Sequence, residues 1–240
     1  MGINQPSFYD GLVLHRRPYR ETSLIVDFFT RELGRVSAVC RGVRGAKSSK
    51  SNEKKSILQP FQPLRLSIKG RSELKTLTQI ESNGRGFEFK GSVMFSALYV
   101  NEILNRVIPK EVAYPEIYDL YLASLLRLSE QETIETVLRE FEINLLLNLG
   151  YGFDWHQDWR NQTSIAAGNY YSFVSERGFQ QLPGFENQGN CFDGRDLNDI
   201  ANFVWTDTSL KAAKRITRMA LRPIIGDKPL KSRELFQKLE

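Results

Sequence analysis

The chain is poor in the residues that build metal and redox sites. Its 240 residues include two cysteines and two histidines. Cys40 and Cys191 are too few for a disulfide framework and favour a reducing compartment. His15 and His156 lie far from both cysteines in the sequence, and no CxxC or HExxH spacing is present. The sequence therefore predicts no structural zinc site.

Long apolar runs are also missing. No stretch approaches 18 apolar residues, and the N-terminus lacks the apolar segment of a secretory signal. We therefore expect neither a membrane span nor a signal peptide, and we expect a cytoplasmic protein.

Catalytic motifs are absent as well. There is no GxxxxGK[ST] phosphate loop and no GxSxG elbow. Several acids lie on or beside one expected helix, where they are typical of a solvated face: Glu130, Glu132, Glu135, Glu140 and Glu142. A metal-dependent nuclease needs acids that converge from different elements. We expect no enzyme, and we interpret both histidines as surface or packing residues.

What the chain does have is an uneven distribution of charge. Its net charge of +5 combines +10 over residues 11–90, −6 over residues 91–168, +5 over residues 205–240 and −4 over the remaining residues. Basic residues often do no more than solvate a surface. Their clustering near the N-terminus favours a polyanion as partner instead.

The segment Gly34–Lys55 concentrates this positive charge. From Arg35 onward it has seven basic residues and one acid, Glu53. An alternating apolar run ends at Cys40 and is followed by Gly, Ser and Lys residues. The pattern predicts a strand that continues into a mobile cationic loop, Arg41–Lys55, suited to a nucleic-acid backbone.

The first 80 residues contain five short apolar or alternating runs, as expected for a small five-stranded barrel. An OB fold and an SH3-like barrel both fit this count. In the fourth run, Leu64–Lys69, basic residues alternate with apolar ones, so that one face presents cations. The basic residues expected to bind a nucleic acid on the barrel and its loop are Arg35, Arg41, Arg44, Lys47, Lys50, Lys54, Lys55, Arg65, Lys69, Arg71 and Lys75. The sequence does not identify aromatics that stack on bases, because Tyr9, Tyr19, Phe28, Phe29 and Phe61 fit a core equally well.

After Gly91 the apolar period becomes helical, which makes the fold class α+β. Helices are expected at 93–108, 117–128, 133–149, 196–204, 209–221 and 232–239, with Pro223 and Pro229 as breaks, and a short strand at 170–174. The expected segments are a DNA-binding barrel (1–82), a central helical domain (88–151), a loop-rich region (152–195) and C-terminal helices (196–240). Within the last segment, basic residues share one face of Leu210–Arg222, which suits an acidic peptide, a nucleic-acid backbone or simply solvent.

Most of the chain resembles the bacterial RecO family of recombination mediators. The resemblance runs through GLVLHRRPYRETSLIVDFFTRELGRVSAVCRGVRGAKS, LQPFQPLRLSIKGRSELKTLTQIE, SALYVNEILNRVIP, LREFEINLLLNLGYG and SLKAAKRITRMALRPIIGDKPLKSRELF, and is weakest over residues 152–195. It implies an N-terminal OB domain and a nucleoid-associated protein of DNA repair and recombination in the RecF pathway, with no enzymatic cofactor. Such a protein binds single- and double-stranded DNA, anneals complementary strands and helps RecA load onto DNA coated by single-stranded-DNA-binding protein (SSB).

The resemblance also implies two protein partners, RecR and the acidic C-terminal tail of SSB. The family's tail pocket matches Arg139, Ile143 and Lys211, and Arg215 lies one turn from Lys211 on the basic helix. The alternative interpretation is that Arg139 has no role in tail binding and forms an ion pair with Glu135 or Glu142. Some family members carry a four-cysteine zinc module after the segment that matches residues 149–152. This chain has only Cys191 there, so we expect no zinc.

Two alternatives to a mediator are a scaffold for RecR and SSB with incidental DNA contact, and a nuclease or glycosylase. The second would need a metal or a catalytic acid that the sequence does not reveal.

Overall fold

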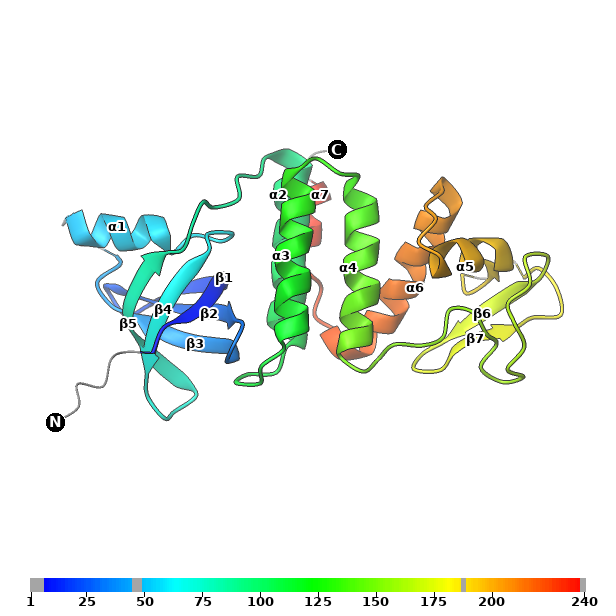
Figure 1. Ribbon diagram of the computed structural model, residues 1–240, viewed down its shortest axis with the longest axis horizontal. Coiled ribbons are helices and arrows are strands. Elements are labelled where there is room, and N and C mark those ends of the chain that lie inside the picture. Colours follow the sequence, from blue (N-terminus) through cyan, green and yellow to red (C-terminus); the bar gives the residue numbers. More distant parts are fainter. Residues whose placement is uncertain (1–6, 45–48, 187–188, 238–240) are drawn as a thin grey trace. The chain divides into compact units, whose positions relative to one another are not determined.

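The structure, a computed structural model, describes residues 7–44, 49–186 and 189–237 (Figure 1). The chain divides into two compact units. One contains the residues up to Glu130 together with the segment from Pro229 onward, and the other contains Gln131–Lys228.

The first unit begins with a closed five-stranded barrel, as expected from the sequence. Its strands are β1 (Tyr9–Tyr19), β2 (Ser23–Thr30), β3 (Gly34–Cys40), β4 (Leu64–Lys69) and β5 (Leu74–Ser82). They are arranged in the order β1-β2-β3-β5-β4, and β1 closes the barrel by pairing antiparallel with β4. Strands β3 and β5 run parallel. This order and this parallel pair identify an OB fold and exclude the SH3-like alternative.

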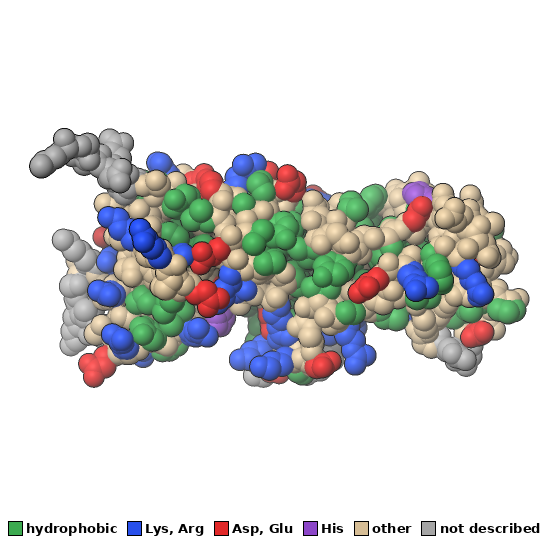
Figure 2. All heavy atoms as spheres, turned by 90° about the horizontal axis from the view of Figure 1, so that it is seen from below, with side chains coloured by type: hydrophobic (Ala, Val, Ile, Leu, Met, Phe, Trp, Pro, Cys, Tyr) green, Lys and Arg blue, Asp and Glu red, His purple; other side chains and the backbone are tan. Residues whose placement is uncertain are grey.

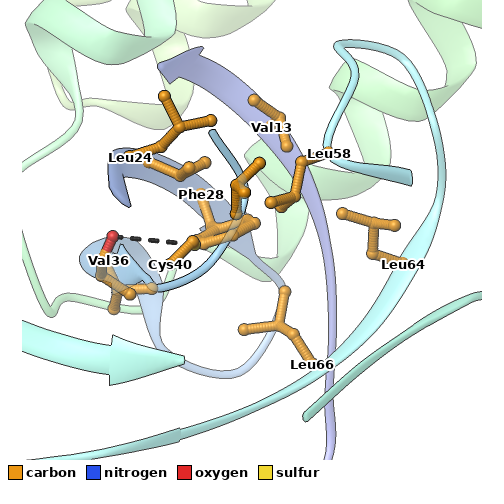
Figure 3. Packing of buried hydrophobic residues seen from close by; sticks show 11 residues of the cluster. Val13, Leu24, Phe28, Val36, Cys40, Leu58, Leu64 and Leu66 are labelled. Atoms are coloured by element: carbon orange, nitrogen blue, oxygen red, sulfur yellow. Dashed lines mark hydrogen bonds between the residues drawn. The ribbon is translucent and has the colours of Figure 1, made fainter. Parts of the chain in front are cut away.

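The barrel interior is filled by the inward residues of the five strands. Val13, Val26 and Phe28 are fully buried, and Leu66 on β4 completes the layer. Figure 3 shows Leu58, which follows α1 (Ser49–Ile57), packed among Val13, Leu24 and Phe28. Helix α1 is thus attached to one end of the barrel by an apolar residue inserted into the core.

This helix corrects the prediction of a mobile loop over Arg41–Lys55. Residues 49–57 are helical, although they lack the regular apolar stripe that identifies a helix in a sequence. The contacts that hold α1 are made at one buried serine, Ser51, and at its C-terminal end, where Ile57 packs against the core and Leu58 enters it. Lys47 lies outside the described residues. In the sequence, the segment Arg41–Lys55 was distinguished by its charge alone.

Two long helices cover the outer face of β1 and β2. They are α2 (Gly91–Val107) and α3 (Pro115–Ser129). Phe29 points outward from the barrel yet is fully buried, because its ring lies 5.6 Å from Tyr118 and 6.3 Å from Tyr121 on α3. The hydroxyl of Tyr121 donates to Asn101, whose amide donates to the Val13 carbonyl at 3.1 Å. The short helix α7 (Lys231–Gln237) packs against α2.

The second unit is built on α4 (Ile134–Asn148) and α6 (Asp207–Ile225), with α5 (Gly194–Ala201) against α6. Helix α6 begins with a capping box between Thr206 and Ser209. It continues through Pro223, which was expected to end it. Pro223 stands in the last turn, so the helix loses the one hydrogen bond of the missing N–H, and only Ile224 and Ile225 follow the proline.

Residues 152–195 contain more structure than the sequence indicated. The predicted strand is β6 (Tyr170–Val174), and it pairs with β7 (Gly178–Gln181) and β8 (Phe192–Asp193). Strands of four and two residues are too short for a recognisable alternation. Aromatic rings fill the space beside this sheet, with Phe153 4.8 Å from Phe173 and 4.9 Å from Trp155.

The compact units divide the expected helical segment 88–151. Helices α2 and α3 group with the barrel because they bury their apolar faces on it, whereas α4 packs against α6. Within the described residues, no helix has both the length and the hydropathy needed to span a bilayer.

Candidate nucleic-acid interface

Basic side chains surround one end of the barrel, where the β1–β2 turn, the end of β3 and helix α1 meet. Two hollows lie there and share Arg44. The first is lined by Arg16, Arg17, Pro18, Leu24, Val43, Arg44, Asn52 and Lys55, and the second by Arg20, Glu21, Thr22, Ser23, Arg41 and Arg44. We call the six basic residues of this lining, Arg16, Arg17, Arg20, Arg41, Arg44 and Lys55, the basic rim. Lys and Arg side chains are also visible on the barrel face in Figure 2.

A bulge in β1 helps to place the first of these side chains. The register with β2 shifts between Val13 and His15, after which Arg16 lies opposite Val26. Because paired residues share a face, Arg16 points to the core side at the end of the barrel. Its guanidinium donates to the Leu58 carbonyl at 2.9 Å and to the Gln59 side chain at 2.8 Å. Arg16 thereby connects β1 to the segment that follows α1.

The β1–β2 turn brings further cations to the same end. The backbone N–H groups of Val43 and Arg44 donate to the Thr22 carbonyl at 2.9 and 3.0 Å. The Arg44 guanidinium donates to the Arg20 carbonyl at 3.2 Å. These bonds hold the segment after β3 against the turn, so that Arg20, Arg41 and Arg44 line one hollow. In an OB fold, the loop between strands 1 and 2 is one of the two that contact oligonucleotides.

The structure places only some of the predicted DNA-binding residues together. Arg41, Arg44 and Lys55 belong to the basic rim. Lys54 is exposed on α1 but lines a different groove, between α1 and β5. Lys47 lies outside the described residues, and of Lys50 only the backbone, within α1, is described.

Three other predicted residues are engaged within the first unit. The Arg35 side chain is half-buried and donates to the Ile108 carbonyl at 2.8 Å. Burial lowers the pKa of this guanidinium from its ordinary value. Lys75 is paired with Glu111 at 2.8 Å, and its side chain is only 12% exposed. Arg65 lies 3.5 Å from Glu81 and over the ring of Phe8.

Lys69 and Arg71 occupy the β4–β5 turn, the second loop that contacts oligonucleotides in OB folds, and both are exposed. Neither lines the two hollows of the basic rim.

Sequence reasoning missed three members of the basic rim: Arg16, Arg17 and Arg20. A signal was present, since these three arginines fall within five residues beside the first expected turn. The basic segment from which DNA binding was predicted began only at Arg35, so these three residues lay outside it.

The barrel aromatics do not offer the stacking platform considered from the sequence. Phe28, Phe29 and Phe61 are buried, at 0%, 0% and 3% exposure. Tyr9 and Tyr19 are half-buried, and the Arg20 guanidinium lies 5.2 Å from the centre of the Tyr19 ring. Cations therefore dominate this surface.

A second arrangement of interest lies in the other unit, where α4 packs against α6. Arg139 is buried with a side-chain exposure of 6%, and its Nη2 lies 2.9 Å from Glu142 Oε1. Glu142 is fully buried and also accepts a hydrogen bond from the Thr217 hydroxyl. The expectation that Glu142 belongs to a solvated acidic face is wrong, because this ion pair and hydroxyl accompany it into the interior.

The Arg139 guanidinium is incompletely satisfied by the residues that the structure describes. Its Nε and Nη1 atoms are buried and find no hydrogen-bond acceptor among them. Ile143, one turn along α4, is half-buried, and Lys211 on α6 is exposed. Arg215 is directed to the segment before β8, where it donates to the Gly189 carbonyl and stacks 4.6 Å from the centre of the Phe192 ring.

Across the described ranges, no group of three or more His, Cys, Asp or Glu side chains is arranged to hold a metal ion.

Comparison with known proteins agrees with this architecture. The family model for the N-terminal part of recombination protein O matches residues 7–84, and the model for its C-terminal part matches residues 90–234. Together they cover the barrel and almost all that follows. The chain belongs to the RecO family.

Individual RecO relatives align along nearly the whole chain. The DNA repair protein RecO of Pseudoalteromonas atlantica is 48% identical over 228 residues, which are 95% of this chain and 93% of that protein. The RecO proteins of Alteromonas mediterranea and Haemophilus influenzae are 45% and 42% identical, and they cover 95% and 97% of this chain and 95% and 96% of their own lengths.

Membership of the RecO family supports a role in DNA repair and recombination, with DNA and protein partners of the RecF pathway. RecO proteins are recombination mediators, and the matches assign no catalytic activity.

Proposed function

We propose that this protein binds single- and double-stranded DNA with the basic rim, anneals complementary strands and helps RecA to load onto SSB-coated DNA. The observation that carries the proposal is the convergence of six cations from β1, the β1–β2 turn, the end of β3 and α1. Among the described residues that line the two hollows, Glu21 is the single acid.

The mechanism is electrostatic. Each phosphate that a Lys or Arg neutralises releases condensed counterions, which gives sequence-independent affinity. Two complementary strands repel one another through their phosphates. A cationic surface that holds either strand reduces this repulsion, so that base pairing can begin. No catalytic group is required for annealing.

The test is a variant without the charges around the β1–β2 turn, Arg20→Ala/Arg41→Ala/Arg44→Ala. The matched control, Arg85→Ala/Arg160→Ala/Arg195→Ala, removes three exposed arginines that do not line the basic rim. We expect the rim variant to lose about tenfold or more in affinity for an oligonucleotide at 0.1 M salt. The slope of log K against log[salt] should fall by roughly 2 to 3. The control should keep both values, and equal losses in the two variants would refute the assignment.

Annealing of complementary strands, measured with and without SSB at two salt concentrations, separates the mediator from its alternatives. Annealing that fails in the rim variant supports the mediator. Strand cleavage supports a nuclease. No effect of the unaltered protein on the strands, with RecR and SSB binding intact, supports a scaffold.

We also propose that Arg139, Ile143, Lys211 and Arg215 of the second unit receive the acidic C-terminal tail of SSB. The observation in favour is the buried Arg139 guanidinium, whose Nε and Nη1 find no acceptor among the described residues. A carboxylate is the ligand that such a planar donor group binds best. Ile143 adds an apolar wall, and Lys211 adds an exposed cation. Arg215 needs to leave its contact with Phe192 to take part.

Arg139→Lys is the sharpest variant for this site. Lysine keeps the positive charge beside Glu142 but lacks the planar set of donors. We expect it to lose binding of an SSB-tail peptide while DNA binding by the basic rim is kept. Equal loss of both activities would contradict two separate sites. RecR is the second protein partner that we propose. RecR binding is to be measured for Arg139→Lys and for Arg20→Ala/Arg41→Ala/Arg44→Ala in the same experiment.

A further inference from the structure

The first hollow of the basic rim is a cavity of about 410 Å³ with two chemically different parts. Its apolar part consists of Pro18, Leu24 and Val43, and the last two are members of the barrel core. Its polar part consists of Arg16, Arg17, Arg44, Asn52 and Lys55. Among the residues that the structure describes, this lining contains no acid.

The strands explain why apolar and cationic groups meet there. Pro18 lies opposite Leu24 in the β1–β2 ladder, so both side chains share the core side of the sheet. Val43 is 2% exposed and follows the end of β3. Helix α1 stands over this end of the barrel and contributes Asn52 and Lys55, both exposed, to the lining.

Four cations around one cavity favour an anionic ligand. The apolar floor of the cavity, formed by Pro18, Leu24 and Val43, favours a ligand that also has an uncharged surface. A bare phosphate ion would leave the floor wet, and a hydrocarbon would leave the cations unmatched. A nucleotide has both parts, a flat base and a phosphate. The volume is within the range of sites that hold small ligands.

We propose that this cavity binds a single unpaired nucleotide of a DNA strand, with its base on the floor of Pro18, Leu24 and Val43 and its phosphate among Arg17, Arg44 and Lys55. This proposal rests on the proposed function, DNA binding by the basic rim, and deepens it. A base in a duplex is stacked and paired, so it reaches such a cavity only after costly flipping. The cavity therefore makes the protein prefer single strands, through contacts that backbone neutralisation alone does not supply.

Two pairs of matched variants on α1 test the cavity. Asn52→Trp places an indole in the lining, whereas Ser56→Trp makes the same change at an exposed position of α1 outside it. Lys55→Ala removes a cation from the lining, whereas Lys54→Ala removes its neighbour, which lines another groove. We expect Asn52→Trp and Lys55→Ala to lower the affinity for single strands about fivefold or more. Ser56→Trp and Lys54→Ala should change it less than about twofold, since each lacks a role in the cavity. Equal effects within both pairs would overturn the proposal.

A second measurement uses the unaltered protein, so it does not depend on how a variant folds. Affinities are compared for an oligothymidylate and for an oligonucleotide of equal length and charge that carries abasic residues. Stronger binding of the thymidylate by about fivefold or more supports a base site. Equal affinity overturns it. Competition by free dTMP identifies the source of the nucleotide: millimolar inhibition fits a strand, and inhibition as strong as that by the oligonucleotide overturns the strand assignment.

The two proposals fail in distinguishable ways. If the abasic strand binds as well as the thymidylate while Arg20→Ala/Arg41→Ala/Arg44→Ala still abolishes binding, the basic rim binds DNA and the nucleotide cavity is wrong. If that triple variant retains full affinity, the proposed function itself is wrong.

Discussion

The carboxylate of Glu102 accepts two hydrogen bonds from Ser232, one from its backbone N–H and one from its hydroxyl, both at 2.8 Å. The Lys231 N–H donates to the same carboxylate at 3.0 Å, and Arg106 pairs with it at 2.8 Å. Glu102 on α2 therefore caps the first turn of α7, which is 130 residues further along the chain.

Replacing Glu102 with Gln should detach α7 from α2. The amide keeps one acceptor but loses the charge that strengthens the bonds to Ser232 and Arg106. We expect the free energy of unfolding to fall by about 1.5 to 3 kcal/mol. Hydrogen exchange of the residue 231–235 amides should accelerate as well. Glu88→Gln is the control, because Glu88 is exposed and lies 4.0 Å from Arg85 in a surface pair. Equal destabilisation by both substitutions would contradict a capping role.

The same contact predicts that the free energy of unfolding decreases at acidic pH. Burial raises the pKa of Glu102, but the hydrogen bonds from Ser232, Lys231 and Arg106 outweigh it and hold the pKa below the ordinary value. Unfolding thus returns the carboxyl to a higher pKa. The stabilisation is present above the unfolded pKa, about 4.3, and is lost as the pH falls through the lower folded value. Urea unfolding at pH 6 and at pH 3 should show a smaller difference for Glu102→Gln than for the unaltered protein.

The buried pair of Arg139 and Glu142 yields a second prediction. Removing one member leaves the other charge buried without its partner, which costs about 3 to 5 kcal/mol. We expect Glu142→Gln to destabilise the second unit by that amount. Arg139→Met/Glu142→Leu should destabilise it much less, because no charge remains inside. A thermodynamic cycle of Arg139→Met, Glu142→Leu and the double variant measures the coupling. If the two single variants add without coupling, the pair is not the source of the effect.

The two cysteines should differ in reactivity. Cys40 is 2% exposed, and burial raises the pKa of its thiol to about 12. At pH 8 the thiolate is therefore rare there, and alkylation needs the thiolate. Cys191 is half-buried. We expect iodoacetamide to modify Cys191 on the order of 100-fold faster than Cys40 in the native protein. Mass spectrometry of each site checks this, and unfolding in urea should equalise the rates. Comparable native rates would mean that the barrel core opens readily.

The barrel and the long helices could be predicted from the sequence because their apolar periods are regular. Strand β4 was predicted within its observed bounds, Leu64–Lys69, and β6 likewise. Helix α1 was not predicted because it has no apolar stripe of its own. Leu58, the residue after the helix, attaches it to the barrel by packing in the core. Short strands such as β7 depend on the partner strand, which a local pattern cannot show.

Charge alone located the candidate interface only in part. The sequence pointed to Arg41, Arg44 and Lys55, which the structure gathers at the barrel end. It pointed equally to Arg35 and Lys75, which are engaged with Ile108 and Glu111. The sequence does not show whether a basic residue in a strand-rich segment is free to bind a ligand at the surface or is bonded to a residue far along the chain. Proximity of Arg16 and Arg17 to α1 likewise depends on the closure of the barrel.

Arg16 gives the last prediction, because it joins β1 to the end of α1. Its guanidinium donates to the Leu58 carbonyl and to Gln59 at 2.9 and 2.8 Å. Arg16→Ala removes both bonds, so we expect a loss of about 1.5 to 3 kcal/mol in the free energy of unfolding. Hydrogen exchange over residues 51–57 should accelerate, since α1 is then held mainly by Leu58. Arg17→Ala is the matched control: Arg17 is the exposed neighbour, and it removes the same charge from the basic rim. If Arg17→Ala loosens α1 as much as Arg16→Ala does, charge and not the bond to Leu58 positions this helix.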